Sequence, residues 1–235
     1  MMYMKLVSAP FACAVLAFNA TAVAEQFVVI QSTNGALKAG EMVDSQKVTV
    51  GKDASVTLLT PSGKSIFVDG PHSGPVTLNS PSGATPDGNM IAALNRLVAD
   101  NATSTSSLGV VRAAEKDVTL AKGELSAEPS GPQCIRAGVA VMIKRAVANE
   151  DETAKLKMTG GKRKKVKWAA GEDVTAWPKG LPIKDGGVYL LRRGSGGLPG
   201  KIQLHILANG SAHDSYFGAW AAASGCTLQA DMIAK

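Results

Sequence analysis

The most unusual local chemistry of this sequence is a basic run in its C-terminal half. Residues 155–167 read KLKMTGGKRKKVK, and seven of these thirteen residues are Lys or Arg. The Gly160-Gly161 pair predicts a hairpin tip, so the run is expected to form a two-stranded ribbon. Cations at this density can bind phosphates or carboxylates. The candidate anion-binding residues are Lys155, Lys157, Lys162, Arg163, Lys164, Lys165 and Lys167.

This basic run has two interpretations. In an exported protein its anionic ligands would be lipopolysaccharide, anionic lipid headgroups or acidic polysaccharide, rather than nucleic acid. Alternatively, the lysines belong to an edge hairpin and prevent aggregation through its unpaired strand edge. The run contains no acidic residue, so the ligand-binding interpretation stays open beside the structural one.

Cysteines supply the second candidate chemistry. Of the three in the sequence, Cys13 lies in an apolar N-terminal segment that we expect to be removed, which leaves Cys134 and Cys226. Two cysteines in an exported chain predict one disulfide, closing a loop of about 90 residues. Its loss is expected to destabilise the C-terminal module and to leave the N-terminal module nearly unchanged. The alternative is a Cys226 nucleophile activated by His213.

Other patterns of catalysis or metal binding are missing from the sequence. Gly63-Lys64-Ser65 resembles the end of a phosphate-binding loop, but Leu58 stands where the motif requires its first glycine. No spacing is typical of a zinc site, and no paired carboxylates stand in a recognisable motif. We therefore expect a non-enzymatic protein without cofactor or metal, with an unrecognised enzyme as an alternative.

The N-terminal residues predict export. Lys5 precedes a mostly apolar run at residues 6–20, and Ala22-Val23-Ala24 has the small-x-small pattern of a signal peptidase site. The run is short for a membrane span, and no later apolar run reaches about 18 residues. We expect residues 1–24 to be a signal peptide. The mature protein, beginning near Glu25, would be periplasmic or secreted and would have no transmembrane segment.

Charge and composition divide the mature chain. Residues 25–132 contain 8 Lys or Arg and 11 Asp or Glu, a net charge of −3, whereas residues 133–235 contain 16 and 8, a net charge of +8. Aromatic residues are scarce and glycine is plentiful, with Val, Thr and Ser in short runs between turn residues, which favours β structure. The two halves are therefore expected to face different electrostatic tasks.

The N-terminal half predicts short strands followed by one helix. Residues 26–32 have the composition of a strand, and residues 55–60 and 65–69 flank a turn in which Gly63 supplies a positive φ. After Pro86, apolar residues at helical spacing predict an amphipathic helix over residues 87–100.

Two segments of this half carry a family resemblance. Residues 37–43 (LKAGEMV), followed by residues 56–74 (VTLLTPSGKSIFVDGPHSG), resemble the short hairpin repeats of FecR-like periplasmic β domains. They are also similar to a group of uncharacterised exported bacterial proteins. The resemblance implies a small β fold and a periplasmic location. Some FecR-like proteins relay signals, but no cytoplasmic segment or membrane span is expected here, so we do not extend that role to this chain.

The C-terminal half predicts an immunoglobulin-like antiparallel sandwich that ends in a helix. Trp168 and Trp177 are expected in its core. An alanine-rich helix is expected from Ser211, interrupted at Gly225 and resumed over residues 227–233. The strand candidates are residues 135–145, 153–159, 162–168, 187–193 and 201–207.

These elements predict a mainly β protein with a few helices. We expect a β-hairpin domain at residues 25–100, a linker at residues 101–132 and a sandwich-like domain at residues 133–235. The leading functional hypothesis is a non-enzymatic envelope protein that acts through contacts with another envelope protein. The alternatives are binding of anionic envelope polymers or lipids through the hairpin at residues 155–167, and an unrecognised enzyme.

Overall fold

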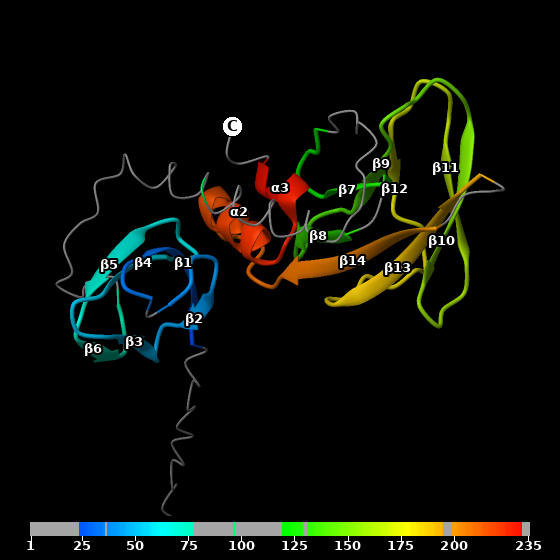
Figure 1. Ribbon diagram of the computed structural model, residues 1–235. Coiled ribbons are helices and arrows are strands. Elements are labelled where there is room, and N and C mark those ends of the chain that lie inside the picture. The colour runs from blue at the N-terminus through cyan, green and yellow to red at the C-terminus, as the bar shows by residue number, and fades with distance from the viewer. Residues whose placement is uncertain are drawn as a thin grey trace, which may run out of the picture.

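The computed structural model describes residues 24–35, 37–77, 96, 119–128, 131–194 and 199–231. Nearly all of the predicted signal peptide and most of the predicted linker lie outside these residues, and so does the predicted helix over residues 87–100 apart from Arg96, which is helical. The described chain is mainly β, with two short helices near its C-terminal end, as the sequence predicts (Figure 1). None of the described helices has the length and apolar character needed to cross a membrane.

The N-terminal strands form one four-stranded antiparallel sheet and one small two-stranded sheet. The first has the order β2-β1-β4-β5, and the second pairs β3 with β6. The predicted hairpin is confirmed, because β4 and β5 pair around a turn in which Gly63 has a φ of 82°. The strands are β1 (Gln26–Ser32), β2 (Met42–Asp44), β3 (Val48–Val50), β4 (Ser55–Leu59), β5 (Ser65–Asp69) and β6 (His72–Gly74).

Strand β1 is buried on both faces. Phe27 and Val29 belong to the core of the N-terminal sheets, whereas the alternate residues Val28 and Ile30 belong to a second cluster shared with the C-terminal helices. An uninterrupted apolar run is typical of a strand covered on both sides. The sequence FVVI therefore packs β1 against its own sheet and against another part of the chain.

The C-terminal strands form a five-stranded sheet, of order β11-β10-β13-β14-β8, and a three-stranded sheet, of order β12-β9-β7. Most neighbours are antiparallel, as predicted, but β8 and β14 pair in parallel, and so do β7 and β9. The strands are β7 (Glu124–Ser126), β8 (Gly131–Arg136), β9 (Met142–Lys144), β10 (Glu152–Met158), β11 (Lys164–Trp168), β12 (Val174–Ala176), β13 (Gly187–Arg193) and β14 (Gly200–Leu207).

Strand β7 and the first residues of β8 occupy positions that the sequence assigns to a linker. The run Glu-Leu-Ser has no apolar alternation from which a strand could be predicted, and its one large apolar side chain, Leu125, is fully buried. The shared core of the two sheets contains Trp168 and Trp177, as expected. Each indole N–H donates to a backbone carbonyl, Trp168 to Ile143 at 3.1 Å and Trp177 to Leu181 at 3.0 Å.

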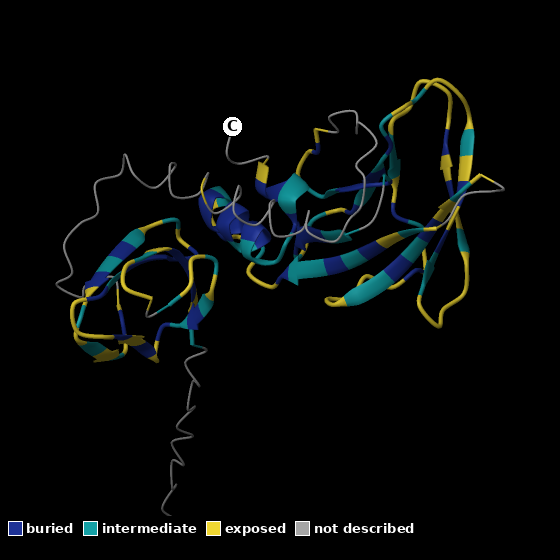
Figure 2. Ribbon diagram, viewed as in Figure 1, coloured by how far each residue is buried: buried dark blue, intermediate teal, exposed yellow. Residues whose placement is uncertain are grey.

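Helices α2 (Asp214–Ala223) and α3 (Thr227–Asp231) pack between the N-terminal strands and β8 (Figure 1). They are separated at Gly225, whose φ of 77° ends the first helix, as the sequence predicts. Most of α2 is buried (Figure 2). It contacts the N-terminal strands through the Tyr216 hydroxyl, which donates to the Gln26 carbonyl at 2.9 Å.

Candidate functional site

The predicted disulfide is present. Cys134 on β8 is bonded to Cys226, which precedes α3, with their Cα atoms 5.8 Å apart. Both cysteines are buried in the cluster that contains α2. The bond excludes Cys226 as a free nucleophile. His213 instead caps α2, with its Nδ1 accepting from the Ser215 backbone N–H at 3.3 Å.

The basic run forms the predicted hairpin. Strands β10 and β11 pair in register, so that Lys155 lies opposite Lys165 and Thr153 opposite Lys167. Alternate residues of both strands, such as Ala154 and Val166, are buried in the sandwich core. The exposed Lys155, Lys165 and Lys167 therefore project from the outer face of the five-stranded sheet.

This charged surface continues beyond the hairpin. Arg192 on β13 lies opposite Lys155, and Lys201 on β14 lies opposite Leu190, which is in turn opposite Lys157. By strand alternation these side chains share one face. We call this set of six cations the basic face. Its members are Lys155, Lys157, Lys165, Lys167, Arg192 and Lys201.

The cations of the basic face have no hydrogen bond or ion pair with another side chain in the part of the chain that the structure describes. The opposite face of the same strands differs. There, the Arg193 guanidinium binds Glu128 and also binds Glu152 with N–O distances of 2.5 and 2.7 Å. This pairing lowers the pKa of Glu152 and raises that of Arg193. Arg193 is therefore paired with carboxylates, whereas its neighbour on β13, Arg192, has no acidic partner among the described residues.

The structure divides the seven predicted residues into groups. Four of them, Lys155, Lys157, Lys165 and Lys167, lie on the basic face. Lys162 and Arg163 lie in the exposed connection between the two strands, and Lys164 alternates to the other face, where its Nζ approaches Gly180. Sequence reasoning missed Arg192 and Lys201, since their place beside the hairpin depends on the order of the strands in the sheet.

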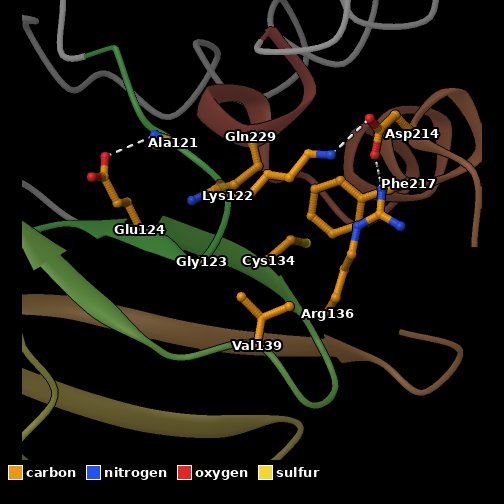
Figure 3. Close-up of a pocket in the computed structure, with 10 residues that line it drawn as sticks. All are labelled: Ala121, Lys122, Gly123, Glu124, Cys134, Arg136, Val139, Asp214, Phe217 and Gln229. Carbon is orange, nitrogen blue, oxygen red and sulfur yellow. Dashed lines mark hydrogen bonds and ion pairs between the residues drawn. The ribbon is translucent and has the colours of Figure 1, made fainter. Parts of the chain in front are cut away.

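A separate pocket of about 330 Å³ lies between β8, the segment before β7 and the two helices (Figure 3). Its apolar wall includes Cys134, Val139 and the Phe217 ring. At one end the guanidinium of Arg136 stands 4.6 Å from the centre of the Phe217 ring. His213 is not among the lining residues.

Charged groups at that end of the pocket already bind one another. Asp214 accepts from the Arg136 guanidinium at 2.7 Å and from the Lys122 ammonium at 2.9 Å. The hydrogen bond from Lys122 is the main cause that lowers the pKa of the Asp214 carboxyl. Asp214, the carboxylate at this end of the pocket, therefore already has two cationic partners.

Gln229 on α3 also lines the pocket, and its amide is unsatisfied. The residue is only 2% exposed, and neither its side-chain nitrogen nor its side-chain oxygen has a hydrogen-bond partner among the described residues. Figure 3 shows it entering the pocket on the opposite side from Val139. Nothing in the sequence marks this glutamine as different from the others.

The described residues contain no group of three or more His, Cys, Asp or Glu side chains placed to hold a metal ion. Comparisons of this chain with known protein families, with curated proteins and with solved structures found no match. The FecR-like resemblance of residues 37–74 therefore stays a prediction, and the roles of the basic face and of the pocket are argued from their geometry.

Proposed function

We propose that this protein is a non-enzymatic envelope protein that binds a polyanionic surface or polymer through the basic face. The observation that carries the proposal is the set of six cations on one face of four neighbouring strands, which have no acidic partner among the described residues. The disulfide supports a place outside the cytoplasm, because such bonds persist in oxidising compartments. The ligand would be an array of phosphates or carboxylates, such as anionic lipid headgroups or lipopolysaccharide.

Without a ligand, the basic face destabilises the folded protein, because its cations repel one another. Neighbouring strands lie about 4.8 Å apart, which is within the Debye length of about 8 Å at physiological ionic strength. Like charges directly opposite each other on a sheet are destabilising, and Lys155 has Lys165 on one side and Arg192 on the other. An anionic ligand would remove this repulsion by neutralising all three charges at once.

Protection of a sheet edge does not account for the whole face. Lysines guard an edge strand against pairing with other chains, and β11 is such an edge. Arg192 and Lys201, however, lie on β13 and β14, which are paired on both sides within the sheet. Their exposed charges favour a ligand that covers several strands.

The test compares Lys155→Glu with Lys52→Glu, which changes the net charge equally at an exposed position in the N-terminal part of the chain. Binding to vesicles that contain anionic lipid, and to lipopolysaccharide, is measured over a range of salt concentrations. We expect Lys155→Glu to weaken binding sharply and Lys52→Glu to leave it nearly unchanged. Wild-type affinity should fall steeply with salt.

Folding stability provides a second readout of the same variant. Because Lys155→Glu places a carboxylate between two cations, it should raise the free energy of unfolding by about 0.5 kcal/mol. Weaker binding by a more stable protein cannot be explained by misfolding. If both variants bind like the wild type across the panel, the basic face has no role in ligand binding and the proposal is wrong.

Contact with another envelope protein is the second candidate function. It is favoured by one specific observation, the pocket lined by Gln229, whose buried amide has no hydrogen-bond partner among the described residues.

A further inference from the structure

We propose that the pocket beside the disulfide binds an extended peptide segment of another protein, with Gln229 pairing to the backbone N–H and C=O of one residue. The inference rests on the second candidate function, contact with another protein, and is independent of the basic face. The segment would be uncharged at this residue and would carry an apolar side chain.

The first support is the state of Gln229 itself. Burial removes an amide from water, and buried polar groups in folded proteins are almost always hydrogen-bonded, so each exception requires an explanation. Gln229 has two donor hydrogens and an acceptor oxygen without partners among the described residues, and the residue lines the pocket. A ligand that offers a donor and an acceptor together would satisfy it.

The second support is another glutamine of the same chain. Gln133 is equally buried, and its Oε1 accepts from the Ser126 backbone N–H at 2.6 Å while its Nε2 donates to the Ser126 carbonyl at 2.9 Å. A residue in an extended chain presents its N–H and C=O at the same edge of the strand, which is why one glutamine can bind both. Gln229 has the same capacity, but its amide pairs with no strand among the described residues.

The remaining walls define the ligand further. Cys134, Val139 and the Phe217 ring offer apolar contact to a side chain. At the far end, Lys122 and Arg136 are already paired with Asp214, so no charged ligand is needed to neutralise them. The volume of about 330 Å³ is at the lower end of ligand pockets, which suits one or two residues of a peptide.

The test titrates the oxidised full chain with N-acetylated, C-amidated tripeptides that have Leu, Val or Phe between two alanines. Binding is followed up to millimolar peptide by the backbone amide NMR signals of the pocket residues Gly123 and Val139, which the Gln229→Leu variant keeps. In the wild type the Gln229 side-chain amide is followed as well. A matched peptide methylated on the central backbone nitrogen lacks the N–H from which the Gln229 side-chain oxygen would accept a hydrogen bond. We expect the Gln229→Leu variant and the methylated peptide each to weaken binding about tenfold or more, and the two changes together to add little.

Stability measurements distinguish a binding role of Gln229 from a structural role. Gln229→Leu removes an unpartnered buried amide, so this variant should be at least as stable as the wild type, whereas Gln133→Leu should be clearly destabilised because it leaves Ser126 unpaired. The proposal is overturned if no peptide of the panel shifts the Gln229 amide, which would leave water as its partner. It is also overturned if wild type and Gln229→Leu bind equally, or if Gln229→Leu is as destabilised as Gln133→Leu. Loss of vesicle binding in Lys155→Glu bears only on the basic face.

Discussion

Replacing both Cys134 and Cys226 by alanine should lower the free energy of unfolding substantially. The two cysteines are 92 positions apart in the sequence, and for a loop of this length the chain-entropy model gives about 4.5 kcal/mol of stabilisation. Measured losses for natural disulfides are about 2–5 kcal/mol, so we expect a loss within that range.

The packing of the disulfide determines which parts of the protein lose stability when the bond is removed. From the sequence alone, the effect is expected to stay within the C-terminal module. In the structure, however, the two cysteines belong to the same buried cluster as α2 and as Val28 and Ile30 of strand β1. Release of α3 from β8 would therefore loosen the support of α2 and expose one face of β1. We now expect the N-terminal strands to lose stability as well.

Urea denaturation of the double variant, followed by tryptophan fluorescence, measures the total loss. Trp168 reports on the core of the sandwich and Trp220 on the cluster around α2. Wild-type protein reduced by a phosphine is the control, because it breaks the cross-link and keeps both sulfur atoms. If the reduced wild type were as stable as the oxidised protein, the argument from loop closure would be refuted. Unchanged hydrogen exchange in β1 would refute the extension to the N-terminal strands.

Two further predictions concern single contacts. Tyr216→Phe removes the hydrogen bond to the Gln26 carbonyl and should cost about 1 kcal/mol of unfolding free energy, measured by urea denaturation; an unchanged midpoint would contradict it. Arg193 holds the pKa of Glu152 below its ordinary value of 4.5, so this stabilisation is complete above that pH and is lost as the pH falls below it. Glu152→Gln should therefore be less stable than the wild type at neutral pH and lose less stability on acidification, whereas parallel acid-unfolding curves would count against the pairing.

Local patterns in the sequence predict most individual elements of this fold. The strands around the basic hairpin, the turn at Gly63 and the helix end at Gly225 depend on neighbouring residues, and the structure has each of them. The parallel pairs are different, because β8 lies beside β14, whose residues are about 70 positions away. The choice of strand partners depends on packing over the whole chain, which alternation within one segment does not encode.

The same limit applies to the candidate sites. The hairpin half of the basic face is predictable, since its lysines are contiguous in sequence and alternate along two strands. Arg192 and Lys201 join it only through the order β10-β13-β14, in which β11 and β12 are skipped. Gln229 gave no signal at all, because a glutamine on a short helix is ordinarily exposed, and only the packing of α3 on β8 shows that it is buried.

The order of the strands also implies that the two proposed sites act independently. The basic face occupies β11, β10, β13 and β14, whereas the pocket lies at β8, the opposite edge of the same sheet. Lys155 on β10 is three strand spacings from β8, or roughly 14 Å. This distance exceeds the Debye length of about 8 Å at physiological salt. Reversing the charge of Lys155 should therefore leave peptide affinity in the pocket unchanged, because the electrostatic coupling across the sheet is largely screened.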